Sequence, residues 1–194
     1  MIRIIGGEFR GRNILPSPGK TTRPMTSLIK KSLFDTLGAW FPGATVGDFY
    51  CGTGTLGVEA LSRGADLCCF ADRDNVALRL LRRNIATLGV VDKSRVWAGT
   101  VERILEPRLE ELGRGLDVAF VDPPFPQARE WNWAFVEQKI FAPIARHLSP
   151  QGIVALRMPD DVEHPDAIGD LAVAKIKKYG GMKVLLLAAA RELE

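Results

Sequence analysis

Between residues 45 and 157 the chain alternates short apolar runs with longer segments of helical periodicity, and this alternation restricts the fold more than any other feature. The apolar runs predict strands at 45–49, 67–72, 95–98, 116–121 and 152–157. The segments between and after them predict helices at 55–63, 75–88, 101–112 and 132–147. Strands that alternate with helices in this way are typical of a mostly parallel sheet with helices on both faces.

The C-terminal part has a different pattern. Two apolar runs, 171–178 and 182–189, flank Tyr179-Gly180-Gly181, and two glycines between strands indicate an antiparallel hairpin. Adding this hairpin to the five earlier strands gives an α/β, Rossmann-like fold with a seven-stranded, mostly parallel sheet.

The N-terminal part is short and basic. Strands at 2–5 and 13–15 surround a glycine-rich turn, and a helix is expected from Thr26 or Ser27 to about residue 39. Residues 1–40 hold seven Lys and Arg against two acidic residues, a net charge of +5 in a chain whose total is +3. A basic arm on a near-neutral body is typical of a nucleic-acid partner, although an ordinary solvated surface can have the same composition.

Composition excludes several other classes of protein. With 46% hydrophobic and 25% charged residues, the 194-residue chain can form a sizeable core. No apolar stretch approaches the roughly 20 residues that span a bilayer, and the N-terminus lacks the layout of a signal peptide, so we expect a cytoplasmic protein. The three cysteines and two histidines have no metal-ligand spacing, so no metal site is expected.

The turn Asp122-Pro123-Pro124-Phe125 follows the strand at 116–121 directly. The prolines must stop that strand, which leaves a carboxylate, a proline carbonyl and an aromatic ring at its carboxyl end. Open α/β sheets bind ligands at that edge. Two acceptors beside an aromatic ring suit a planar group with an exocyclic amine. The alternative is a stiff turn with a core phenylalanine.

A glycine loop follows the first strand of the alternating region. Gly52, Gly54 and Gly57 match G-x-G-x-x-G, with a predicted strand before them and a predicted helix after them. Glycines let the backbone turn tightly and approach a ligand, and the helix N-terminus offers N–H groups to it. A nicotinamide-dependent oxidoreductase could use the same pattern.

Two acidic residues sharpen this prediction, and the first of them favours S-adenosylmethionine over a dinucleotide. Asp48, at the tip of the strand, suits the ammonium and sulfonium groups of S-adenosylmethionine and has no obvious use beside a pyrophosphate; it could otherwise cap the helix. Asp72 ends the next strand, where a carboxylate can accept the ribose hydroxyls. It could otherwise be a surface carboxylate beside Arg73.

Together these motifs resemble the class I S-adenosylmethionine-dependent methyltransferases that act on amino groups. More narrowly, the chain resembles the RsmD family, which methylates guanine N2 in 16S ribosomal RNA. The resemblance is carried by residues 3–12, by Arg23-Pro24 with Leu33-Phe34, by residues 57–65 and by residues 117–125.

The resemblance implies a cofactor, a site and a partner. S-adenosylmethionine would be held by Asp48, Gly52, Gly54, Asp72, Arg73 and Thr100. Asp122 and the Pro123 carbonyl would accept the amine N–H groups, and Phe125 would stack on the base. RNA phosphates would be held by Arg10, Arg12, Arg23, Lys30 and Lys31. We expect residues 1–40 to be an RNA-contacting extension and residues 41–194 the catalytic domain, folded as one unit. The expected partner is ribosomal RNA or the small ribosomal subunit, with no membrane or metal, and the expected state is a monomer.

The chain departs from the family pattern at a few positions. Met25, Ser27 and Leu28 replace an expected Thr-x-Asp-Arg, and Lys31 replaces an acid. Thr100 stands where many relatives have an acid near the adenine, and Arg157 stands in place of a glutamate.

Three other functions share the motifs. These are adenine-N6 methylation of DNA or RNA, glutamine methylation of proteins, and catalytically silent RNA binding during assembly. The basic arm disfavours a protein substrate.

Overall fold

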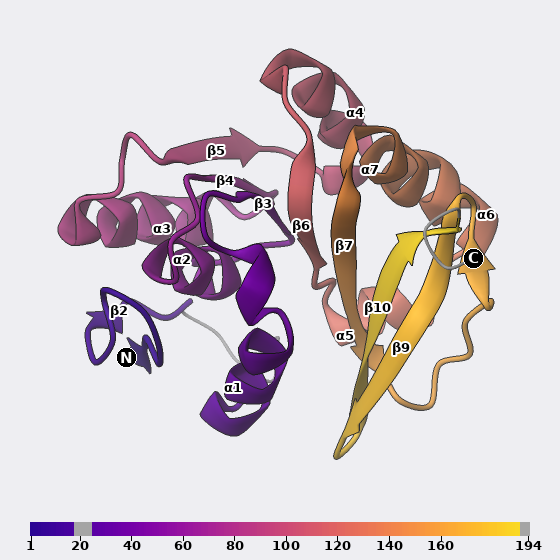
Figure 1. Ribbon diagram of the computed structural model, residues 1–194, viewed down its shortest axis with the longest axis horizontal. Coiled ribbons are helices and arrows are strands. Elements are labelled where there is room, and N and C mark those ends of the chain that lie inside the picture. Colours follow the sequence, from indigo (N-terminus) through magenta and orange to yellow (C-terminus); the bar gives the residue numbers. More distant parts are fainter. Residues whose placement is uncertain (18–24, 191–194) are drawn as a thin grey trace.

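The computed structural model describes residues 1–17 and 25–190. Within these residues, eight strands form one sheet in the order β5–β4–β3–β6–β7–β10–β9–β8 (Figure 1). The first five strands in this order run parallel, and β10 is antiparallel to both of its neighbours. The expected Rossmann-like sheet with a C-terminal antiparallel hairpin is therefore confirmed. The eighth strand, β8, is a two-residue addition that pairs with the start of β9.

The strands agree closely with the predicted ranges. In the main sheet they are β3 Thr45–Phe49, β4 Leu67–Asp72, β5 Ser94–Ala98, β6 Leu116–Val121, β7 Leu148–Pro159, β8 Ala167–Ile168, β9 Leu171–Tyr179 and β10 Met182–Ala189. A separate two-stranded sheet pairs β1 (Ile2–Arg3) with β2 (Asn13–Ile14). The strand β7 begins earlier than predicted, because Ser149-Pro150-Gln151 reads as a loop in the sequence but continues the strand.

The helices also follow the predicted pattern, with one region broken up. They are α1 Ser27–Thr36, η1 Gly38–Trp40, α2 Thr55–Ser62, α3 Asn75–Leu88, α4 Val101–Leu112, α5 Phe125–Arg129, α6 Trp133–Val136, the π-helical η2 Glu137–Phe141 and α7 Ala142–His147. The predicted helix 132–147 is thus α6, η2 and α7 in succession, and α5 was not predicted. No helix in the described ranges is long and apolar enough to cross a membrane.

The sheet separates two hydrophobic cores, because successive side chains of a strand point to opposite faces. On one face α1, α2 and α3 pack on strand residues such as Phe70 and Phe120. On the other face α4, η2 and α7 pack on residues such as Val121 and Leu156. Figure 1 shows α2 and α3 together on one side of the sheet and α4 and α7 on the other.

Glu59 of α2 is fully buried and ties the N-terminal residues to that helix. Its Oε2 accepts the Ile5 N–H at 3.0 Å and pairs with Lys30 Nζ at 3.1 Å, and its Oε1 pairs with Arg63 Nε at 3.3 Å. Lys30 also donates to the Arg3 carbonyl at 2.9 Å. We call Lys30, Glu59 and Arg63 the Glu59 cluster.

Two further contacts hold the same segment in place. A Cβ atom at Gly7 would lie 1.7 Å from the Ser62 carbonyl oxygen, so a side chain cannot be accommodated there. The Asn84 side chain in α3 accepts the Leu15 N–H at 2.8 Å and donates to the Leu15 and Thr53 carbonyls at 3.2 Å each. The N-terminal turn is therefore connected, through α2 and α3, to the glycine loop.

Candidate active site

The parallel strands end at one edge of the sheet, which we call the carboxyl edge. Strand register places Phe49 opposite Val121 and Val121 opposite Leu156, so the ends of β3, β6 and β7 are neighbours. In Figure 1, α5 lies at the carboxyl end of β6. The carboxyl edge thus collects the glycine loop, the Asp122 turn and Arg157, which comes from the end of β7.

Two of the three glycines of the glycine loop have different roles. Gly52 has φ +53°, and an added Cβ would meet no atom within 4 Å. Gly57 lies in the first turn of α2, where a Cβ would come within 2.3 Å of Phe70 Cε1 and 2.5 Å of Cys68 Sγ. Gly52 therefore leaves open space beside the loop, whereas Gly57 allows α2 to pack closely on β4.

Asp48 and Asp72 both bind the backbone of this loop. Asp48 is buried, and its Oδ2 accepts the Gly57 N–H at 2.8 Å, which is the helix-capping contact that the sequence left open. Asp72 accepts the Gly52 N–H at 2.7 Å and the Asp74 N–H at 2.9 Å. Burial raises the pKa of Asp48, the nearby Asp122 and Asp72 charges raise this pKa further, and the Gly57 N–H opposes them.

The structure places Arg73 and Thr100 near these acids without a strong contact. Arg73 is exposed, directly after β4. Thr100 is the N-cap residue of α4, but its side chain makes no capping hydrogen bond.

A polar cluster beside the loop was missed in the sequence. Tyr50, with φ +63°, donates its hydroxyl to Glu102 Oε1 at 2.6 Å, and Gln127 Nε2 donates to the same oxygen at 2.7 Å. Glu102 Oε2 is buried and has no hydrogen-bond partner among the described residues. Burial and the Glu102 carboxylate raise the pKa of Tyr50. The available signal was the position of Glu102, two residues after Thr100 at a strand end.

Asp122 has a partner that the sequence did not suggest. Its backbone N–H donates to the Phe49 carbonyl at 3.1 Å, and its Oδ1 accepts a hydrogen bond from Arg157 Nε in an ion pair whose arginine is buried and whose carboxylate is partly exposed. The Arg157 guanidinium carbon also lies 5.0 Å from the centre of the Phe125 ring. Burial raises the pKa of Asp122, and the Arg157 charge opposes this shift.

The residues expected to bind RNA fall into different environments. Arg10 is exposed, and Arg12 donates to the Thr87 carbonyl at 2.7 Å. Lys31 is exposed and pairs with Asp35 at 2.5 Å. Lys30 is only 3% exposed and belongs to the Glu59 cluster, so its charge is used inside the fold.

Arg23, the fifth of these residues, lies outside the described residues.

Strand β9 adds basic residues that the N-terminal charge count overlooked. Lys175 and Lys178 are exposed, and Lys177 Nζ donates to Thr36 Oγ1 of α1 at 2.6 Å. Because Met182 pairs with Pro159 at the end of β7, the tip of the β9–β10 hairpin lies at the carboxyl edge. Residues paired across β9 and β10 share a face of the sheet, so Lys175 and Lys177 lie on the α1 side, whereas Lys178, opposite Lys183, lies on the other side. Lys175 therefore extends the basic surface from α1 along the hairpin.

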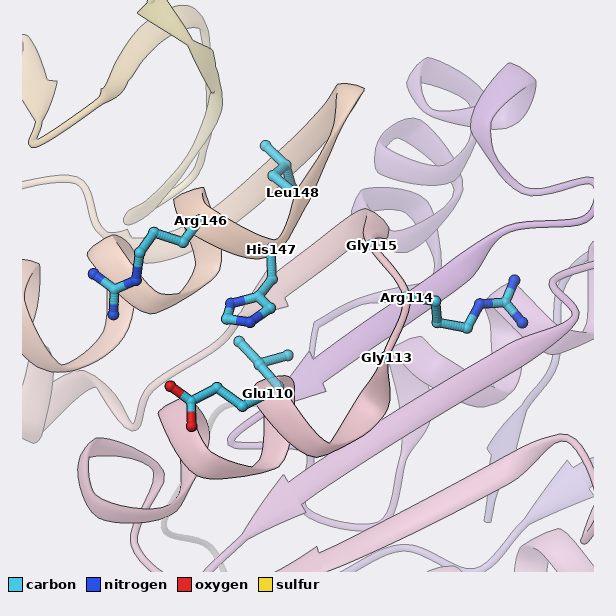
Figure 2. A pocket seen from close by; sticks show the side chains of 8 residues that line it. Glu110, Gly113, Arg114, Gly115, Arg146, His147 and Leu148 are labelled. Carbon is cyan, nitrogen blue, oxygen red and sulfur yellow. The ribbon is translucent and has the colours of Figure 1, made fainter.

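A cavity of about 330 Å³ lies elsewhere, between the end of α4 and the start of β7 (Figure 2). It is lined in part by Glu110, Arg114, Arg146 and His147. Because Gly115 and His147 directly precede β6 and β7, this cavity is at the amino ends of the strands. Ligands of open α/β sheets bind at the opposite edge, so we assign the candidate site to the carboxyl edge.

The sheet order, the glycine loop, the acids at the strand ends and the Asp122-Pro123-Pro124-Phe125 turn together define a class I methyltransferase. Solved structures agree. A hypothetical protein of Thermus thermophilus is 27% identical, with a TM-score of 0.79 over 97% of this chain and 100% of that one. A structure titled "Putative methyltransferase yhhF from Escherichia coli" is 26% identical, with a TM-score of 0.78 over 97% of each chain.

The chain belongs to the family described as "Conserved hypothetical protein 95", whose model matches residues 2–188. The "Putative rRNA methyltransferase YlbH" of Bacillus subtilis is 33% identical over 92% of this chain and 94% of that protein. The "Ribosomal RNA small subunit methyltransferase D" of Escherichia coli is 35% identical over 64% of this chain and 60% of that protein. The resemblance to RsmD-type methyltransferases is thus confirmed.

Proposed function

We propose that the protein transfers a methyl group from S-adenosylmethionine to the exocyclic N2 of a guanine in small-subunit ribosomal RNA. The observation that carries the proposal is the hydrogen bond from the Asp122 N–H to the Phe49 carbonyl, which joins the acceptor turn directly to the strand that leads into the glycine loop. A cofactor on the loop and an amine on the turn would then be neighbours. The names of the two relatives support ribosomal RNA as the substrate.

The residues present fit S-adenosylmethionine. Gly52 leaves open space beside the loop, so a ligand can approach the backbone there. Asp72 is half-buried at the strand end, where it could exchange a backbone partner for the ribose hydroxyls. The unpartnered Oε2 of Glu102 would accept a hydrogen bond from the adenine amine, two residues after Thr100, whose hydroxyl would be the weaker acceptor.

When bound, S-adenosylmethionine supplies an electrophilic methyl group on a sulfonium. The residues of the chain act on the other reactant. An exocyclic base amine is a poor nucleophile because its lone pair is delocalised into the ring. Asp122 and the Pro123 carbonyl would accept its N–H groups and orient the lone pair, and Phe125 would stack on the base. Both acceptors bind the positive charge that develops on nitrogen more strongly than the neutral amine, which lowers the barrier. As the methyl group leaves the sulfonium for the nitrogen, the methylated amine would lose one proton to the Asp122 carboxylate or to water.

The test is methyl transfer from labelled S-adenosylmethionine to 16S ribosomal RNA, assembled small subunits and duplex DNA, with the products digested to nucleosides. We expect N2-methylguanosine from an RNA acceptor and no product from DNA. Formation of N6-methyladenine would support methyl transfer to an exocyclic amine but would show that adenine, not guanine, is the acceptor. Cofactor binding without any product from these acceptors would favour a silent RNA-binding protein.

The two glycines separate cofactor binding from folding. We expect Gly52→Ala to weaken S-adenosylmethionine binding, because the new methyl group enters the open space beside the loop. Its left-handed backbone should also cost about 1–2 kcal/mol of stability. Gly57→Ala should lower the melting temperature further and leave cofactor affinity less affected, because its methyl group would overlap Phe70 and Cys68. Calorimetry measures the cofactor affinity of both variants, and thermal unfolding measures their melting temperatures. The prediction is contradicted if the two variants change affinity and melting temperature to the same extent.

The basic surface formed by Arg10, Arg12, Lys31 and Lys175 would bind RNA phosphates. Each phosphate contact releases counterions, so binding weakens as salt rises. We expect the double variant Arg10→Glu, Arg12→Glu to bind RNA more weakly and to lower the slope of log K against log salt by about one to two.

Fluorescence titrations at several salt concentrations measure that slope. Arg108→Glu is the matched control, because Arg108 is an exposed arginine on α4, which covers the other face of the sheet. An unchanged affinity and slope in the double variant would remove the N-terminal turn from the RNA surface.

A further inference from the structure

We propose that Arg157 is a positioning residue for methyl transfer, because it fixes Asp122 and Phe125 relative to each other where the methyl-accepting base would bind. This inference rests on the proposed amine site at Asp122 and Pro123. It goes beyond that site by assigning a role to a residue at which this chain departs from the family pattern.

A single buried side chain contacts two of the three groups that would hold the base. Arg157 is 5% exposed, its Nε donates to Asp122 Oδ1, and its guanidinium carbon lies 5.0 Å from the Phe125 ring centre. The contact follows from strand register, since Leu156 is opposite Val121 and the next residue on each strand is Arg157 or Asp122. A guanidinium is planar and rigid, so binding a carboxylate and an aromatic ring together restricts the orientation of both.

The ion pair also suits the hydrogen bonds that an amine needs. An amine presents N–H groups, so the atoms facing it must be acceptors. An ionised carboxylate only accepts and has lone pairs on both oxygens, so Arg157 at Oδ1 does not exhaust its capacity. A protonated carboxyl would turn an O–H donor toward the amine.

Arg157 opposes that protonation. Burial raises the pKa of Asp122, and the buried Asp48 carboxylate of β3 is close enough for the two acids to interact. From β7, the Arg157 charge lowers the pKa of Asp122. The arginine of α5, Arg129, is paired with Asp161 at 2.6 Å. The activity should therefore be lost as pH falls through the pKa of Asp122, and removing Arg157 should move that loss to higher pH.

The experiment compares the wild type with Arg157→Ala and Arg157→Lys, using the RNA acceptor and saturating S-adenosylmethionine across a range of pH. We expect Arg157→Ala to lower kcat by about 10- to 100-fold. The fall in kcat at low pH should begin at a higher pH in this variant, while the dissociation constant of the cofactor stays unchanged. Added guanidinium ion, well below denaturing concentrations, should restore part of the rate. Arg157→Lys keeps the charge, so its fall in kcat should begin near the same pH as that of the wild type.

Arg129→Ala is the matched control, because it removes an exposed arginine–aspartate pair close to the same turn and should leave the rate and pH profile unchanged. If Arg157→Ala does not fold, Arg157→Gln retains an N–H donor without the charge and carries the same expected shift in pH.

Two outcomes overturn the inference. An unchanged kcat and pH profile in folded Arg157→Ala would leave Arg157 with a purely structural role. A faster rate or a lower KM for RNA in Arg157→Ala, with inhibition by guanidinium, would mean that Arg157 occupies the binding position of the base and must be displaced before the base can bind. Failure of the proposed function is distinct, because Asp122→Ala would then keep full activity or the wild type would transfer no methyl group.

Discussion

Replacing Asp122 with alanine should lower kcat for methyl transfer by about 100- to 1,000-fold, the loss typical of removing one group that stabilises transition-state charge. The carboxylate would accept an amine N–H and bind the positive charge that develops on nitrogen. The Pro123 carbonyl remains in the variant, so some activity should survive. Single-turnover transfer to RNA measures the loss, and calorimetry should give an unchanged cofactor affinity.

Two further variants make this result interpretable. Asp122→Asn keeps an acceptor for Arg157 and for the amine, so its kcat should fall less than that of Asp122→Ala. Because the buried arginine keeps a partner, this variant also controls for misfolding. Asp161→Ala removes an exposed carboxylate that pairs with Arg129 and should leave the rate unchanged. An Asp122→Ala enzyme as fast as the Asp161→Ala control would exclude Asp122 from the chemistry.

The second large effect concerns stability. Glu59→Ala should lower the free energy of unfolding by about 3–5 kcal/mol, because it leaves Lys30 and Arg63 without their carboxylate inside the fold. The Ile5 N–H also loses its acceptor. For a chain of this length each kcal/mol shifts the melting temperature by about 2–4 °C, so the expected drop is roughly 6–20 °C. Thermal and urea unfolding measure it.

The chain contains its own control for this prediction. Asp35 also pairs with a lysine of α1, but both members of the Lys31–Asp35 pair are more than half exposed. Asp35→Ala should therefore leave the free energy of unfolding almost unchanged, because exposed ion pairs contribute little to stability. Replacing Lys30 and Glu59 together with methionine should recover much of the stability lost in Glu59→Ala, because no buried charge of that pair remains. Equal losses in Glu59→Ala and Asp35→Ala would contradict the prediction.

The sequence predicts most of the sheet because the buried parallel strands are continuous apolar runs bounded by turn residues. Strands β3, β4 and β6 and helices α3 and α4 have the predicted bounds. The errors occur where local signals are ambiguous. The α5 helix begins at Phe125, directly after two prolines that read as a turn, and the π-helical η2 interrupts a region whose periodicity suggests one continuous helix.

The candidate site shows a different limit. Glycine spacing and strand-end acids indicate the loop and the Asp122 turn, because those residues act where the local chain places them. Partners from distant segments leave no such pattern. The sequence suggests a surface charge at Lys30, but in the structure Lys30 pairs with Glu59 of α2. The sequence shows Arg157 only as a departure from the family pattern, but the pairing of β7 with β6 places it beside Asp122. The contact between the two residues had one signal in the sequence: Arg157 ends its predicted strand at the same edge of the sheet as Asp122.

The attachment of the N-terminal turn to α2 and α3 also affects the order of events during synthesis. Residues 1–15 leave the ribosome before α2 and α3 do, yet Leu15 binds Asn84, 69 positions further along, and Gly7 packs on Ser62. At about 5–20 residues per second, residues 1–15 wait several seconds for the synthesis of the helices on which they pack. The arginine-bearing turn is therefore exposed to the crowded surroundings of the nascent chain before the methyltransferase domain can hold it in place.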